Sequence, residues 1–233
     1  MRILALDCSA KSVSVCIAEN ENLLFESFLN INLTHSETLM PMCEQALKNT
    51  RLTLNDIDAL AITAGPGSFT GVRIGISAIK GICFGAEKPV FAYSTLDAMA
   101  LAFDGNGFEG IICGVMDARR EQFYNALFEI KNGKLSRLCD DRIITYDLLE
   151  AELTKLNEKI VLVGDGAELF NSLIKANNNV CLAPKSFLVQ RAGGIALNAS
   201  GNNCIINSIS ANALKPTYLR KSQAEREREA KLK

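Results

Sequence analysis

The sequence predicts an α/β fold built from two duplicated lobes. Each half opens with a strand, a polar turn and two further strands, and each half then alternates helices with strands. A polar, glycine-containing linker, residues 104–107, separates the halves. The 233 residues are 48% hydrophobic, which suffices for a core without disulfides or metals and excludes a largely disordered chain. We expect an N-terminal lobe over 1–103, a smaller C-terminal lobe over 104–214 and a charged tail over 215–233.

Hydrophobic periodicity locates the elements of the first half. An apolar run ends at Asp7, and a short polar turn leads into two more strands. The first helix begins at Thr34-x-x-Glu37, which reads as a capping box. The expected elements, in order, are strands 2–6, 13–18 and 23–29, helix 35–49, strand 59–64, helix 70–85, strand 90–93 and helix 95–102.

The second half repeats this order. Asn132-Gly133 predicts a hairpin turn after its second strand. The expected elements are strands 111–116, 123–130 and 142–145, a helix from 147, strand 160–163, a helix from 167, strand 180–183 and helix 187–199.

Charge and residue counts exclude several classes of function. The net charge is −1, which argues against a protein that holds nucleic acid by electrostatics alone. The tail, 215–233, carries seven Lys or Arg and three Asp or Glu, so the body is acidic, and any RNA contact is expected at the tail. A single histidine excludes a site built from several imidazoles.

Cysteine usage and hydropathy predict a cytoplasmic protein. The eight cysteines include no Cys-x-x-Cys pair, and most lie in apolar runs, as buried thiols do in a reducing compartment. The N-terminal apolar run is too short for a signal peptide, and no stretch reaches the length expected of a membrane span.

Two loops could bind phosphate. The turn from Asp7 to Ser12 offers a carboxylate and hydroxyls that could hold a hydrated metal and a phosphate, but these are also ordinary turn residues. The loop 65–75 joins a strand to a helix, where free N–H groups could cradle phosphate. It is not a Walker A loop, because Val72 stands where the lysine should be. A plain glycine turn remains the alternative.

Helices 35–49 and 70–85 carry apolar residues around most of their circumference. Gly71 and Gly75 lie four residues apart, a spacing that lets another backbone approach closely. We interpret the pair as an interface in preference to ordinary core, because a helix that is apolar all round must be buried against something. For His35, beside the start of the first helix, a capping or surface role is favoured.

Five stretches together resemble the bacterial TsaB (YeaZ) family. The most specific is Ala-Gly-Pro-Gly-Ser-Phe-Thr-Gly-Val-Arg-Ile-Gly at 64–75; the others lie at 3–9, 34–41, 117–124 and 216–220. The resemblance covers essentially the whole chain. It implies a two-lobed actin/Hsp70-like ATPase fold (ribonuclease H-like, ASKHA), which agrees with the duplicated pattern.

The resemblance also implies a function. The chain would be a non-catalytic scaffold subunit in the transfer of threonylcarbamoyl to the adenosine beside the anticodon of tRNA. It would pair with a TsaD-like catalytic subunit, and with itself as a homodimer, through helices 35–49 and 70–85. A TsaE-like ATPase would be a further partner, and tRNA would be met only through the complex. The residues assigned to the partner surface are His35, Leu39, Met42, Cys43, Gly71, Ile74, Gly75, Ala78 and Ile82.

The resemblance further implies that the chain is not an enzyme. Thr95 and Met99 stand where the catalytic relative holds its metal with two histidines, and neither replaces an imidazole as a ligand. An older glycoprotease description therefore finds no support in these residues. The alternative is an actin-like ATP-binding enzyme in its own right.

That alternative depends on the residues available for a nucleotide, which are Asp7, Ser9, Gly164 and Gly166. We expect no cofactor to be required by the isolated chain, and at most weak binding of ATP or ADP with Mg²⁺ at the partner interface.

Overall fold

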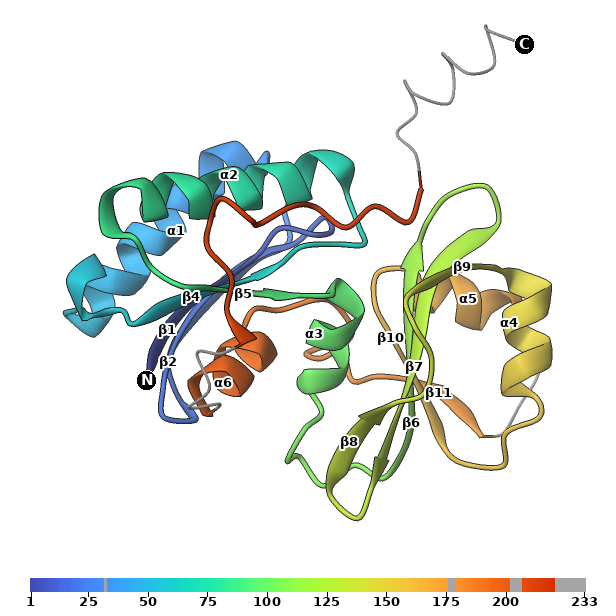
Figure 1. Ribbon diagram of the computed structural model, residues 1–233. Coiled ribbons are helices and arrows are strands. Elements are labelled where there is room, and N and C mark those ends of the chain that lie inside the picture. The colour runs from blue at the N-terminus through green and yellow to red at the C-terminus, as the bar shows by residue number, and fades with distance from the viewer. Residues whose placement is uncertain (32, 176–178, 202–206, 221–233) are drawn as a thin grey trace, which may run out of the picture.

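A computed structural model describes residues 1–31, 33–175, 179–201 and 207–220. Two mixed sheets form the centres of two lobes that lie side by side (Figure 1). The elements up to the linker are β1 (Arg2–Asp7), β2 (Val13–Glu19), β3 (Asn22–Leu29), α1 (His35–Thr50), η1 (Leu54–Asp56), β4 (Ala59–Thr63), α2 (Phe69–Ala86), β5 (Val90–Tyr93) and α3 (Thr95–Leu101).

The second half supplies nine further elements. They are β6 (Gly110–Asp117), β7 (Gln122–Lys131), β8 (Lys134–Arg137), β9 (Arg142–Thr145), α4 (Tyr146–Leu153), β10 (Ile160–Val163), α5 (Ala167–Leu173), β11 (Val180–Leu182) and α6 (Gly193–Gly201).

The strand order confirms the duplication. The first sheet has the order β3-β2-β1-β4-β5, and the second has β11-β10-β6-β7-β8 with β9 also paired to β7. In both sheets the first strand of the half is central, antiparallel to the next strand and parallel to the strand after the first helix of that half. The repeat is therefore one of topology, and the turns that follow β1 and β6 line the same cavity.

Local expectations failed in three places. Thr34 makes no side-chain capping bond among the described residues, so the proposed capping box is absent. Strand β8 was not expected, because its four residues are mostly exposed and show no apolar alternation. Helix α6 begins at Gly193 instead of residue 187, since Leu188 gives its carbonyl to the N–H of Gly164 at 2.6 Å. This hydrogen bond to a residue distant in sequence takes the place of the helical hydrogen bond that the Leu188 carbonyl would otherwise accept.

The predicted lobe boundaries also differ from the packing. Helix α6, expected in the C-terminal lobe, buries Ile195, Ala196 and Ala199 against the first sheet. Leu214 joins the core that α1 and α2 share with the same sheet. Helix α3, expected in the first lobe, contributes Leu96 and other residues to the second core. The chain therefore crosses between lobes at α3 and returns at α6, and Figure 1 shows both helices between the sheets.

Among the described residues, helix α2 is long and apolar enough, by length and composition alone, to cross a membrane. The prediction that no stretch reaches the length of a membrane span is therefore wrong for residues 69–86. Seven of its residues are buried, and they face the first core. The helix also carries exposed Arg73 and Lys80. Its apolar character is thus explained by packing on the sheet, because a buried core helix can be as long and as apolar as a membrane span.

Candidate docking face and interlobe cavity

The turn after β1 is closed on itself. Asp7 is buried, and its Oδ1 accepts hydrogen bonds from the Ser9 backbone N–H at 3.0 Å and the Ser9 hydroxyl at 2.9 Å. Its other oxygen, Oδ2, has no hydrogen-bond partner among the described residues. Burial raises the pKa of the Asp7 carboxyl, and the bonds from Ser9 offset this only in part. One of the two carboxylate oxygens is therefore used to hold the turn itself.

The glycine loop packs against that turn. A Cβ on Gly67 would overlap the carbonyl oxygen of Ser9, and one on Gly71 would overlap that of Cys8. The Ser68 N–H donates to the Ser9 carbonyl at 2.6 Å. These glycines are thus required so that two backbones can touch. The geometry favours the glycine turn over the phosphate cradle, since an N–H at the helix start is already bonded within the chain.

An open cavity of 880 Å³ lies between the lobes. Its lining comes from the turn after β1, the start of α2, the β6–β7 turn, the β10–α5 turn and the C-terminal segment. Basic and acidic side chains both reach it: Lys11, Arg119, Arg120, Asp117, Asp165, Glu168 and Arg220. The cavity is large enough for a small molecule and has no single sign of charge.

The four nucleotide candidates are only partly at this cavity. Ser9 and Gly164 line it, whereas Asp7 and Gly166 are not among the described lining residues. A Cβ on Gly164 would overlap the carbonyl oxygen of Val115, and one on Gly166 would lie 2.8 Å from the Asp117 nitrogen. Both glycines therefore allow the β10–α5 turn to pack on the end of β6, which gives them a structural role.

Helix α3 lies at the junction of the lobes. Thr95 and Met99 are both buried in packing contacts. Within the described ranges, no group of three or more His, Cys, Asp or Glu residues is placed to hold a metal.

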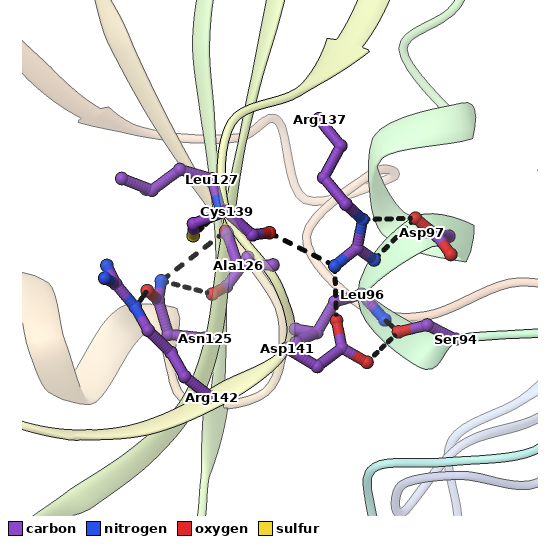
Figure 2. Close-up of polar contacts among 11 residues, drawn as sticks. Ser94, Leu96, Asp97, Asn125, Ala126, Leu127, Arg137, Cys139, Asp141 and Arg142 are labelled. Carbon is purple, nitrogen blue, oxygen red and sulfur yellow. Dashed lines mark hydrogen bonds and ion pairs between the residues drawn. The ribbon is translucent and has the colours of Figure 1, made fainter. Parts of the chain in front are cut away.

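A clamp that the sequence did not signal fastens α3 to the second lobe (Figure 2). The Arg137 guanidinium lies 2.6 Å from Asp97 on α3 and 2.8 Å from Asp141. Asp141 in turn accepts a hydrogen bond from the Ser94 hydroxyl at 2.5 Å. The residues lie up to 47 positions apart and share no motif, so only their spatial proximity identifies the clamp.

The predicted partner surface proves to be mostly core. Six of the nine assigned residues are buried between the helices and the first sheet: Leu39, Met42, Cys43, Gly71, Gly75 and Ile82. These six residues are therefore not accessible for partner contact, contrary to the prediction. The apolar excess of α1 and α2 is largely explained by one helix layer on one sheet face, with Leu4, Leu6 and Leu60 opposite it.

A smaller exposed face remains on the same helix pair. His35, Ile74 and Ala78 line a groove of 520 Å³ together with Met40, Phe69, Arg73 and Ser77. Met40 is 47% exposed, and Phe84, on the same helix as Ile74, is 95% exposed. Phe84 lies outside the lining of the groove, so this single exposed side chain does not by itself mark a contact surface. We call Met40, Ile74 and Ala78 the docking face.

His35 links the docking face to the turn after β1. Its Nε2 lies 2.8 Å from the Ala10 carbonyl oxygen, the bond of a ring nitrogen that carries its proton. Its ring also lies against Gly71, where a Cβ would come within 3.1 Å of the ring carbon Cδ2. The histidine therefore holds α1 to the neighbouring loop and does not cap the helix.

Comparison with known proteins identifies the class to which these features belong. Residues 30–227 match the family described as TsaD, tRNA N6-adenosine threonylcarbamoyltransferase. The fold matches a Pseudomonas aeruginosa protein described as similar to peptidase YeaZ, with a TM-score of 0.80, 23% identity and coverage of 94% of this chain and 99% of that one. It also matches an Arthrobacter polyphosphate/ATP-glucomannokinase with a TM-score of 0.50, 11% identity and coverage of 85% and 98%. The class is thus a two-lobed protein of the actin-like ATPase fold.

Relatives with similar sequences identify the family within this class of proteins. The chain is 31% identical to the Escherichia coli (strain K12) tRNA threonylcarbamoyladenosine biosynthesis protein TsaB, over 96% of both chains. It is 30% identical to the Bacillus subtilis (strain 168) protein of that name, over 75% of this chain and 76% of the relative. The chain belongs to the TsaB (YeaZ) family, and this confirms the resemblance drawn from the sequence.

Proposed function

We propose that the chain is a non-catalytic scaffold subunit in tRNA threonylcarbamoyladenosine biosynthesis. In this role it binds a TsaD-like catalytic subunit through the docking face and activates threonylcarbamoyl transfer to the adenosine beside the anticodon. The observation that carries the proposal is the apolar groove on α1 and α2, which is lined by exposed Met40 and half-buried Ile74 and Ala78. The names of the relatives supply the pathway.

The chemistry of α3 supports a non-catalytic role. A hydroxyl at Thr95 and a thioether at Met99 are poor ligands for a catalytic cation, and both side chains are buried in packing. Activation of the TsaD-like subunit would therefore act through the conformation of that subunit.

The wider assembly follows from the same surface. The docking face can also meet its own copy, so a homodimer would compete with the partner complex. A TsaE-like ATPase would join the pair, and the acidic body of the chain suits tRNA contact only through the complex. We place this work in the cytoplasm, where tRNA is modified.

Substitution on the docking face tests the proposal. Ile74→Glu and Met40→Glu place a carboxylate in the apolar contact and should weaken binding of the TsaD-like subunit by about 100-fold, which corresponds to about 2.7 kcal/mol. The formation of modified tRNA by the assembled complex should fall in parallel. Calorimetry and a nucleoside assay measure the two effects.

Leu148→Glu is the matched control, because Leu148 is 64% exposed on α4 of the other lobe and should leave binding unchanged. Gly75→Arg is unsuitable, since a Cβ there already lies 3.1 Å from Ile62. If Ile74→Glu and Met40→Glu bind as tightly as the unaltered chain, the docking face is misassigned.

We also propose that the isolated chain binds ATP or ADP with Mg²⁺ weakly at most. Only Ser9 and Gly164 of the four candidates line the cavity, and Asp7 is engaged by Ser9. Among the described residues, the unpartnered Asp7 Oδ2 is a feature that suits a hydrated cation. Titration with Mg·ATP checks this: micromolar affinity with turnover would instead favour the alternative, an actin-like ATP-binding enzyme.

A further inference from the structure

The C-terminal segment 215–220 crosses from one lobe to the other. It follows Leu214, which is buried in the first core, and Figure 1 shows it running over the first lobe towards the second. The Thr217 N–H donates to the Ala64 carbonyl at 2.7 Å. A Cβ on Gly65 would lie 2.5 Å from the Thr217 carbonyl oxygen, so the segment rests directly on the loop before α2.

The middle of the segment holds the first turn of α2. The Tyr218 ring stacks on Phe69, with centroids 4.4 Å apart and planes 19° apart. The Arg73 Nε donates to the Tyr218 hydroxyl at 2.7 Å, and its guanidinium carbon lies 3.9 Å from the Phe69 centroid. Phe69 and Arg73 also line the groove beside the docking face. The segment therefore contacts the side chains that shape that groove.

The end of the segment is tied to the second lobe. Arg220 is half-buried, and its Nη1 donates to the Ala118 carbonyl at 2.7 Å. Ala118 precedes three successive residues with positive φ, Arg119 (64°), Arg120 (58°) and Glu121 (59°). Non-glycine residues adopt this conformation only at an energetic cost, so the turn depends on contacts such as this one.

We propose that residues 215–220 form a positioning strap that couples the interlobe cavity to the docking face. Its two anchors, Tyr218 on the first turn of α2 and Arg220 on the β6–β7 turn, are two residues apart. A change in lobe separation must therefore pull on Tyr218 and on the Phe69–Arg73 pair beneath it. The effect on partner affinity rests on the proposed function, but the coupling within the chain does not.

Hydrogen exchange on the isolated full-length chain tests the coupling. Arg220→Ala should raise amide exchange several-fold in two places: at residues 118–122, which lose the tie, and at 71–77 in α2, which Arg220 does not touch. Arg220→Lys keeps a donor and should restore most of the protection. Lys215→Ala removes a charge from an exposed position of the same strap and should change neither region.

A purely local anchor would raise exchange at 118–122 alone, and that result would overturn the coupling. Tyr218→Phe is a milder variant that keeps the stacked ring and loses only the hydroxyl, which guards against misfolding. It should raise exchange at 71–77 by about threefold, in line with the loss of one hydrogen bond.

Binding of the TsaD-like subunit gives the second measurement. Arg220→Ala should lower affinity about tenfold, with the docking face itself unaltered. Affinity equal to that of the unaltered chain would overturn the link between strap and docking face. If the unaltered chain fails to bind the subunit, the proposed function is wrong, while the exchange experiment still decides whether the strap couples the two sites.

Discussion

At the scale of single residues, Asp7 illustrates how a motif position can serve the fold. Its carboxylate receives two bonds from Ser9 and leaves one buried oxygen without a partner among the described residues. A buried carboxylate whose pKa is raised binds protons more readily in the folded chain than in the unfolded one. Ionisation of Asp7 therefore opposes folding at neutral pH.

Asp7→Asn should stabilise the chain at pH 7 by about 1–2 kcal/mol, because it removes the buried charge and keeps an acceptor for Ser9. The sign follows from linkage: ionisation of Asp7 costs stability only above its raised folded-state pKa, so the gain should shrink as pH falls through that pKa and be absent below about pH 4, the ordinary range for an aspartate. Urea unfolding at several pH values measures it. A variant less stable than the parent at pH 7 would contradict this.

At the scale of elements, α3 owes its position to the clamp as much as to its own sequence. The helix has seven residues, which is short for independent stability. Arg137 joins Asp97 of this helix to Asp141 of the second lobe, and its guanidinium also lies 4.8 Å from the Phe128 ring centroid. The clamp therefore turns a short helix into a fixed strut between the lobes.

Arg137→Ala should destabilise the chain by about 2 kcal/mol, because it leaves Asp97 and the mostly buried Asp141 facing each other without a cation. Arg119→Ala is the comparison, since that side chain is 80% exposed and lies 3.7 Å from its carboxylate partner. It should change stability by less than about 0.5 kcal/mol. If the two variants change the free energy of unfolding equally in chemical denaturation, the clamp contributes no more stability than an exposed ion pair.

At the scale of the whole molecule, the two lobes are not independent. Helix α6 comes from the end of the chain and buries one face of the first sheet, opposite the face covered by α1 and α2. Residues such as Ile3, Ala5 and Ala59 would be exposed to water without it. The first lobe therefore cannot complete its core until the second half has been made.

A chain shortened to residues 1–191 should lose its cooperative unfolding transition, although the strands of both sheets remain. In the full chain, Ile195→Ala should cost about 2–5 kcal/mol, since Ile195 is fully buried at this contact. Circular dichroism during heating follows both changes. A shortened chain that unfolds at the same temperature as the full chain would mean that α6 is not needed for the first core.

Much of the fold and part of the site were predictable from local pattern. Apolar runs such as 111–116 and 160–163 gave strands within a residue or two of the observed ends, because burial on both faces of a parallel sheet leaves a continuous apolar signal. The glycine-rich stretch 64–75 indicated the family, since its residue types are set by backbone contacts with the neighbouring turn. The apolar excess of α1 and α2 predicted that both helices are buried against something, but it could not say which side of each helix faces the sheet.

The sequence by itself determined the α/β class, the duplicated strand order and the family, because these depend on periodicity and on motifs that are contiguous in the chain. Only the tertiary structure decided that Leu39, Met42 and Cys43 are core whereas Met40 and Phe84 are exposed, since one layer of sheet fixes the rotation of both helices. The Arg137 clamp, the return of α6 to the first sheet and the strap across the cavity were likewise settled in space. Each of them joins residues far apart in sequence, and no local pattern records such a contact.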